Sequence, residues 1–156
     1  MPRGEDGLDR RYDVVIVGAG TAGLAALREV RKRTDRFLLV NDGPWGTTCA
    51  RVGCMPSKVL IEAANTWHRR RHFEAFGIRG AEALALDLPA VLRRVRRLRD
   101  GFVAGTLQAT AELGDAAVSA RARLLGPGRL EVGGQAVEAR AIVLAPGSSP
   151  VVPAAW

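Results

Sequence analysis

A glycine-rich turn between an apolar run and an amphipathic segment restricts the fold of this chain most strongly. The apolar run from Tyr12 to Val17 is rich in β-branched residues, which predicts a strand covered on both faces. The turn GAGTAG, from Gly18 to Gly23, follows directly, and residues 24–33 then carry apolar side chains at helical spacing. A second apolar run, residues 37–40, follows closely enough to be the parallel strand of a βαβ unit.

The three glycines of this turn suit a dinucleotide-binding loop. Gly18 would permit the tight turn, Gly20 would let the backbone approach a pyrophosphate, and Gly23 would let helix and strand pack closely. The helix N-terminus adds N–H groups and a positive dipole that favour phosphate. An acidic residue that holds a ribose is expected about 20 positions further on. Asn41 stands there instead, and Asp42 brings a carboxylate one position late.

The middle of the chain predicts two helices. Pro56 is expected as the first residue of a helix that runs to about Phe73. Asp87 is expected to cap a second helix, which carries an apolar stripe opposite the arginine run 93–99. Both helices follow a turn-rich stretch after the second strand.

The last third predicts short strands. From Ala117 onward the hydrophobic period falls to two, with glycine breaks at 126–128 and 133–134 and a final apolar strand over 141–145. The expected fold class is α/β: a Rossmann-like domain over residues 12–156 with a central parallel sheet and a small antiparallel β insertion. Residues 1–11 are expected to be a flexible lead.

Composition agrees with one folded domain. Of the 156 residues 47% are hydrophobic and 25% charged, and a domain of this size needs no disulfide or metal to fold. No apolar stretch of about 18 residues and no signal peptide is visible, so a cytoplasmic protein without a membrane span is expected. The net charge of +7 comes mainly from scattered arginines. The runs 69–71 and 93–99 favour a solvated face or a surface for acidic partner chains over a nucleic-acid site.

Two cysteines, Cys49 and Cys54, admit three interpretations. They could be buried thiols that pack like small hydrophobes. They could bind zinc with His68 and His72, although His68 would lie about 18 Å from the start of an unbroken helix, too far for a shared metal. They could form a redox disulfide whose second sulfur lies at a helix N-terminus, where the dipole lowers the pKa of Cys54. The upstream dinucleotide loop favours the redox disulfide, and no metal site is expected.

Three motifs together resemble a known family. GAGTAG, GTTCARVGCMPSK and the late LAPGS look like the FAD-binding first third of the class I pyridine nucleotide-disulfide oxidoreductases. Within the family the cysteine motif is most similar to that of dihydrolipoyl dehydrogenase, with mercuric and glutathione reductases as close relatives. The resemblance runs from about Tyr12 to Pro153.

The resemblance implies a role for each motif. Cys49 would exchange with a small or lipoyl-type substrate disulfide, Cys54 would lie nearest the flavin, and Lys58 would lie beside its ring. Electrons would pass from NAD(P)H through FAD to the Cys49–Cys54 disulfide and then to the substrate. The implied cofactor-binding residues extend from the glycine loop to the last strand: Gly18, Gly20, Thr21, Ala22, Gly23, Asn41, Asp42, Gly46, Thr47, Thr48, Cys49, Gly53, Lys58, Ala120, Ala145, Pro146 and Gly147.

The chain departs from the family pattern at three positions. Asn41 replaces a ribose-binding Glu, Thr47 replaces the second glycine of GGTC, and Pro146 replaces the threonine of ATGS. A glutamate at position 41 is expected to tighten cofactor binding, because a carboxylate can accept hydrogen bonds from both ribose hydroxyls.

The family's other parts are missing from the sequence. It holds no second GxGxxG loop for nicotinamide, no C-terminal His-Glu base and no dimer interface. We therefore expect a truncated form that does not dimerise and that cannot complete the catalytic cycle by itself. The alternatives are a non-catalytic dinucleotide-binding module, a mercuric or glutathione reductase-like fragment, and a basic nucleic-acid or scaffold-binding domain. A flavin absorbance band would distinguish the flavoprotein interpretations from the nucleic-acid or scaffold-binding domain.

Overall fold

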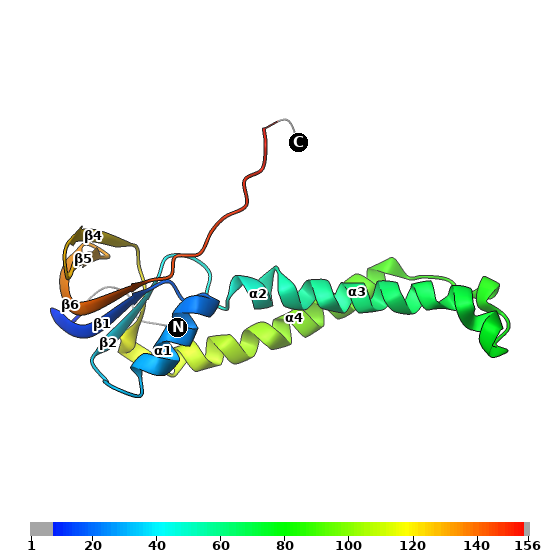
Figure 1. Cartoon of the computed structure of the whole chain (residues 1–156), viewed down its shortest axis with the longest axis horizontal. Helices are drawn as coiled ribbons and strands as arrows, with labels where there is room; N and C mark the ends of the chain where they lie inside the picture. The colour runs from blue at the N-terminus through cyan, green and yellow to red at the C-terminus, as the bar shows by residue number, and fades with distance from the viewer. Residues whose placement is uncertain (1–7, 155–156) are drawn as a thin grey trace. The chain divides into compact units, whose positions relative to one another are not determined.

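The computed structural model describes residues 8–154 and has an α/β fold built on one six-stranded sheet (Figure 1). The strands occur in the order β3-β2-β1-β6-β5-β4. Their bounds are β1 Arg11–Val17, β2 Phe37–Asn41, β3 Ala117–Ser119, β4 Ala122–Gly126, β5 Arg129–Val132 and β6 Gln135–Leu144. The α-helices are α1 Thr21–Val30, α2 Thr48–Arg51, α3 Cys54–Arg69 and α4 Leu88–Ala111. Three 3-10 helices complete the described elements: η1 Arg70–Phe76, η2 Ala81–Ala83 and η3 Gly114–Ala116.

The chain divides into two compact units. One contains the residues up to Thr47 together with those from Thr106 onward, and it includes the whole sheet and α1. The other is Thr48–Gly105, which contains α2, α3 and most of α4.

One sheet contains both the parallel strands and the antiparallel strands that were expected from the sequence. β1 pairs in parallel with β2 and β6, and β2 pairs in parallel with β3. β6 serves two neighbours: residues 138–144 run parallel to β1, while residues 135–138 run antiparallel to β5. β4 adds a further antiparallel pair. The expected antiparallel insertion is therefore an extension of the central sheet.

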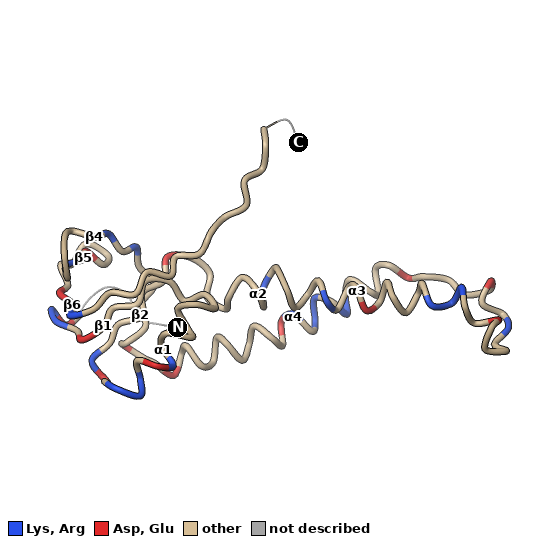
Figure 2. The backbone as a smooth tube through the Cα atoms, in the orientation of Figure 1, with Lys and Arg blue, Asp and Glu red and all other residues tan. Residues whose placement is uncertain are grey.

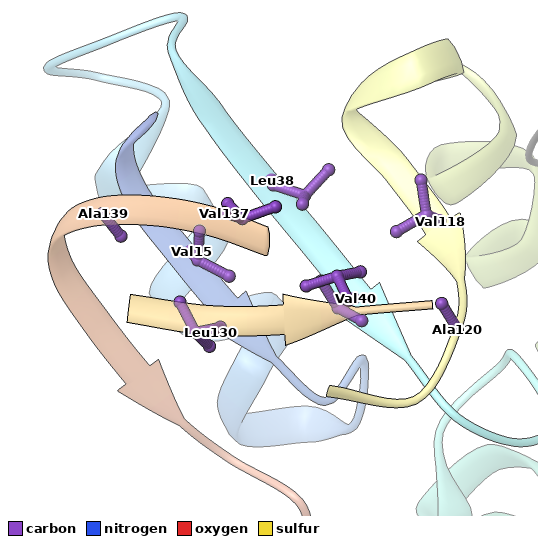
Figure 3. Close-up of a cluster of buried hydrophobic side chains, with 9 residues drawn as sticks. Val15, Leu38, Val40, Val118, Ala120, Leu130, Val137 and Ala139 are labelled. Carbon is purple, nitrogen blue, oxygen red and sulfur yellow. The ribbon is translucent and has the colours of Figure 1, made fainter. Parts of the chain in front are cut away.

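Both faces of the parallel strands are covered. On one face Val15, Leu38 and Val40 pack against side chains of the antiparallel strands, among them Leu130 and Val137 (Figure 3). On the other face the alternating residues of the same strands, such as Ile16 and Leu39, pack against Leu27 of α1. This double burial explains why the strands read as continuous apolar runs in the sequence.

The helix starts confirm one prediction and correct another. Ala90 N–H donates to Asp87 Oδ1 at 2.9 Å, so Asp87 caps α4 as expected. Pro56 was expected to begin a helix, but Cys54 begins it and Pro56 is its third residue. Proline is tolerated there because the N–H groups of the first helical turn have no acceptor within the helix.

Two other boundaries differ from the expectation. The helix expected to reach Phe73 ends at Arg69, and the chain continues as η1 to the left-handed Gly77. Residues 1–7 of the expected flexible lead lie outside the described residues, whereas Arg11 already pairs with Glu138 in the sheet. Among residues 8–154, no helix combines the length and apolar character that crossing a membrane requires.

Candidate functional site

The glycine loop is shaped by contacts within the chain at two of its three glycines. Gly18 has φ +106°, and a Cβ atom placed on it would overlap the carbonyl group of Ala145. A Cβ atom on Gly23 would overlap the carbonyl oxygen of Gly18. A Cβ atom on Gly20 would meet no atom within 4 Å. A side chain at Gly18 or Gly23 would therefore displace neighbouring backbone, while Gly20 borders open space that a ligand could use.

Backbone hydrogen bonds hold this loop against the sheet. Gly18 N–H donates to Val40 O at 2.7 Å, and Ala145 N–H donates to Val17 O at 2.8 Å. The first hydrogen bond of α1 runs from Leu24 N–H to Gly20 O, at 2.9 Å. The N–H groups of residues 21–23 thus precede the helical hydrogen-bond ladder, as in helix N-termini that bind phosphate. The loop fits the pyrophosphate of a dinucleotide such as FAD.

The end of β2 is tied to the same loop. Asn41 Oδ1 accepts a hydrogen bond from Ala19 N–H at 3.1 Å, and Asn41 Nδ2 donates to Gly43 O at 2.9 Å. The buried Ala120 donates its N–H to Asn41 O at 3.1 Å. Asp42 is exposed. The sequence did not reveal that the Asn41 side chain is engaged within the chain, because the contact depends on how β1 and β2 end side by side.

The segment after β6 passes over the start of the glycine loop. Ala145 is half-buried, and its carbonyl group lies where a Gly18 side chain would be. Pro146 and Gly147 are exposed, and Gly147 has φ +75°. The structure therefore brings Ala145, Gly18 and Asn41 together at one end of the parallel strands.

A second group of expected site residues lies in the unit Thr48–Gly105. Cys49 lies in α2 and Cys54 begins α3, with Gly53 between these helices. A Cβ atom on Gly53 would lie 3.1 Å from the carbonyl oxygen of Thr48, which is tighter than ordinary contact. A side chain at position 53 would thus push the two helices apart. Both cysteines are free thiols, with Cys49 half-buried and Cys54 exposed.

The two thiols shift each other's pKa in opposite directions. The Cys49 thiol donates a hydrogen bond to the Cys54 sulfur, which is the main cause of a raised pKa for Cys49 and a lowered pKa for Cys54. The Cys54 backbone N–H and the charge of Lys58 lower the pKa of Cys54 further. The sequence predicted that Cys54 has the lower pKa, and this is confirmed. The largest cause is the hydrogen bond from Cys49, whereas the sequence-based prediction named the helix N-terminus.

Lys58 lies one helical turn beyond Cys54 and also borders a groove. The groove lies between α3 and α4, has a volume of about 690 Å³ and is lined by Lys58, Trp67, Arg94 and Leu98 among others. The guanidinium carbon of Arg70 lies 3.5 Å from the centre of a Trp67 ring. The sequence patterns indicated an amphipathic helix at each side but not the groove, because its width depends on how far apart the helices lie.

Positive charge is concentrated in the same unit. Between Thr48 and Gly105 the sequence holds eleven basic and five acidic residues, so this unit carries six of the seven net positive charges. Figure 2 shows basic residues along α4 and at the end of α3. The arginines at 93, 94, 96 and 97 are exposed, as expected for a solvated face. Such a field favours anionic partners.

The structure gives the zinc interpretation no support. The ring of His68, in α3, and the ring of His72, in η1, have centroids 6.2 Å apart and planes tilted by 59°. Within residues 8–154, no three His, Cys, Asp or Glu side chains gather closely enough to hold a metal ion.

Thr47 has a left-handed backbone, with φ +38°, at the position where the resembling family has glycine. A β-branched residue is strained there. We expect Thr47→Gly to raise the free energy of unfolding by about 1 kcal/mol, because the relief of strain exceeds the added freedom of the unfolded chain. Urea unfolding would measure this change. A lower stability for the variant would mean that the contacts of the Thr47 side chain outweigh the strain.

The sequence comparisons agree with these features. Residues 12–155 match the profile of the family described as pyridine nucleotide-disulphide oxidoreductase. The chain is 32% identical to dihydrolipoyl dehydrogenase of Mycoplasma pneumoniae over 120 residues, which make up 77% of this chain and 26% of that protein. It is 39% identical to mercuric reductase of Streptomyces lividans over 82 residues, which make up 52% of this chain and 17% of that protein. The chain thus spans about a quarter of the length of the first of these relatives.

A solved structure shows the same fold. The flavoprotein disulfide reductase RclA of Escherichia coli, in a Cu(II) complex of a mutant form, matches with a TM-score of 0.71. The match has 20% sequence identity and covers 94% of this chain and 31% of that chain. It confirms the expected Rossmann-like α/β class. Since the family profile spans nearly the whole sequence, the chain belongs to the pyridine nucleotide-disulphide oxidoreductase family.

Proposed function

We propose that this chain is the FAD-binding, dithiol-bearing part of an enzyme that reduces or oxidises a substrate disulfide. The pair of Cys49 and Cys54 is the observation that carries the proposal, because their pKa values are shifted in opposite directions by a shared hydrogen bond. A lowered pKa next to a second thiol is typical of cysteines that exchange disulfides.

The glycine loop supports the cofactor part of the proposal. Open space at Gly20 and the N–H groups of residues 21–23 would receive the FAD pyrophosphate. When bound, FAD would supply a carrier for two electrons, with NAD(P)H as the other nucleotide of the full-length enzyme.

The thiol chemistry balances within the chain and its substrate. A thiolate of the pair would attack the substrate disulfide, forming a mixed disulfide and releasing the first substrate thiol. The second cysteine of the pair would then attack the mixed disulfide, which closes the Cys49–Cys54 bond and releases the second thiol. Two electrons pass from the cysteine pair to the substrate, and of the two protons that the substrate gains, one comes from the remaining thiol of the pair and one from solvent. Following the family resemblance, Cys49 would form the mixed disulfide and Cys54 would lie beside the flavin. Because the shared hydrogen bond raises the pKa of Cys49, the Cys49 proton would pass along that bond to Cys54 as Cys49 attacks.

The FAD assignment is tested by titrating the purified 156-residue chain with FAD and with NAD. We expect FAD to bind with heat released or absorbed in calorimetry, and the complex to carry a flavin absorbance band after desalting. Gly20→Ala is the matched control, because it fills the open space without touching the chain. Uptake of NAD without FAD would contradict the assignment.

The redox assignment is tested by counting thiols before and after mild reduction of the air-oxidised chain. We expect a gain of two thiols for the wild type and no gain for Cys54→Ser, because that variant cannot close the intramolecular bond. A wild-type pair that stays reduced in air would overturn this part of the proposal.

A further inference from the structure

We propose that Asn41 is a positioning residue that holds the glycine loop in the shape that receives the cofactor. The inference rests on the proposed binding of FAD. It assigns the Asn41 side chain to the loop, at the position where the resembling family presents a carboxylate to the ribose. It therefore reverses the sequence-based expectation that a glutamate at position 41 would tighten binding.

Asn41 connects three segments at the end of the parallel strands. Its Oδ1 accepts from Ala19 N–H at 3.1 Å, and its Nδ2 donates to Gly43 O at 2.9 Å. Its backbone oxygen accepts from Ala120 N–H at 3.1 Å. One residue thus links the glycine loop, the turn after β2 and the chain after β3.

The bond to Ala19 fixes the loop next to its functional part. Ala19 is only 2% exposed, so its N–H has little access to water and depends on an acceptor within the protein. The preceding N–H, of Gly18, donates to Val40 O. Two consecutive amide groups of the loop are therefore anchored to the end of β2, directly before the open position Gly20.

An amide suits this place better than a carboxylate. The amide of Asn41 accepts from Ala19 and donates to Gly43, whereas an ionised carboxylate can only accept. An aspartate would place one of its oxygens against the Gly43 carbonyl oxygen without a proton between them. A glutamate is longer by one methylene and would displace both contacts. The exposed Asp42 is left as the carboxylate at this end of β2 that can face a ribose.

The test compares two ligands on several variants. FAD and an FAD analogue that lacks the 2′-hydroxyl of the adenosine ribose are titrated into the wild type, Asn41→Leu, Asn41→Asp and Asn41→Glu. We expect each of these variants to bind both ligands about tenfold more weakly than the wild type does. The ratio of the two dissociation constants should stay at its wild-type value, because Asn41 acts through the loop. In Asp42→Asn the ratio of the dissociation constants of the two ligands should move towards one.

Ser119→Ala is the matched control for a merely structural role. Ser119 pairs with Asn41 in the sheet, and its Oγ accepts a hydrogen bond from Trp45 Nε1 at 2.7 Å. This variant should lose thermal stability and keep its FAD affinity, with both ligands measured on samples shown to be folded by circular dichroism. If Asn41→Asp behaves in the same way, Asn41 only supports the fold and the inference is wrong.

The remaining outcomes are distinct. Tighter FAD binding by Asn41→Glu, together with stronger discrimination against the analogue, would show that position 41 contacts the ribose. This result would overturn the inference about Asn41 and leave the proposed function intact. A changed ligand ratio in the folded Asn41→Leu or Asn41→Asp variant would do the same. No FAD uptake by the wild type would refute the proposed function and this inference with it.

Discussion

Gly23→Ala is expected to destabilise the chain by about 3 kcal/mol or more, whereas Gly20→Ala is expected to change the free energy of unfolding by less than about 1 kcal/mol. The difference arises because a Cβ atom at position 23 overlaps the carbonyl oxygen of Gly18, while one at position 20 meets nothing within 4 Å. A backbone carbonyl cannot rotate away as a side chain can. The strand and the helix would therefore have to separate.

The two variants should also separate folding from cofactor binding. Gly20→Ala should fold normally and bind FAD at least about tenfold more weakly, because its methyl group fills the space proposed for the pyrophosphate. Chemical unfolding and FAD titration on the same samples give both quantities. Normal FAD affinity in Gly20→Ala would show that the cofactor does not approach this part of the loop. A stable Gly23→Ala would contradict the packing of α1 described above.

Replacement of either cysteine is expected to abolish the reversible disulfide and to move the pKa of the remaining thiol. In Cys49→Ala the pKa of Cys54 should rise, because its hydrogen-bond donor is gone. In Cys54→Ala the pKa of Cys49 should fall, because the sulfur that accepts a hydrogen bond from the Cys49 thiol is gone. The shifts therefore have opposite signs.

Alkylation by iodoacetamide across a pH series measures these shifts. In the reduced wild type, Cys54 should form thiolate at a lower pH than an ordinary thiol and should be modified first. As the pH falls through the lowered pKa of Cys54, its reaction should slow. In Cys49→Ala this decline should begin at a higher pH, whereas Lys58→Met, which keeps the Cys49 hydrogen bond, should produce a smaller change in the same direction. Preferential modification of Cys49 at neutral pH would contradict the direction of the hydrogen bond.

The sequence predicted those features that depend on neighbouring residues in the chain. The apolar run before Gly18, the helical spacing after Gly23 and the cap at Asp87 are local patterns, and the structure confirms each of them. The spacing of Cys49 and Cys54 also indicated thiols near a helix start. These predictions hold because backbone propensity and periodic burial decide them.

The sequence could not predict features that depend on residues that become neighbours only in the folded chain. The contact of Asn41 with Ala19 requires the ends of two parallel strands to meet, and the left-handed backbone of Thr47 is set by the turn around it. The true start of α3, before Pro56, depends on how α2 turns into it. A local pattern contains none of these distances.

The double pairing of β6 has a consequence for the order of events during synthesis. β6 lies beside β1, and the ion pair between Arg11 and Glu138 spans 127 positions of sequence. Until a ribosome has made β6, one edge of β1 in the nascent chain is unpaired. The carbonyl group of Ala145, which packs against Gly18 in the folded chain, is also not yet present. Contacts so distant in sequence form late, because the intervening chain must first lose its freedom. The glycine loop, although it precedes β6 in the sequence, should be among the last parts of its unit to reach its final shape.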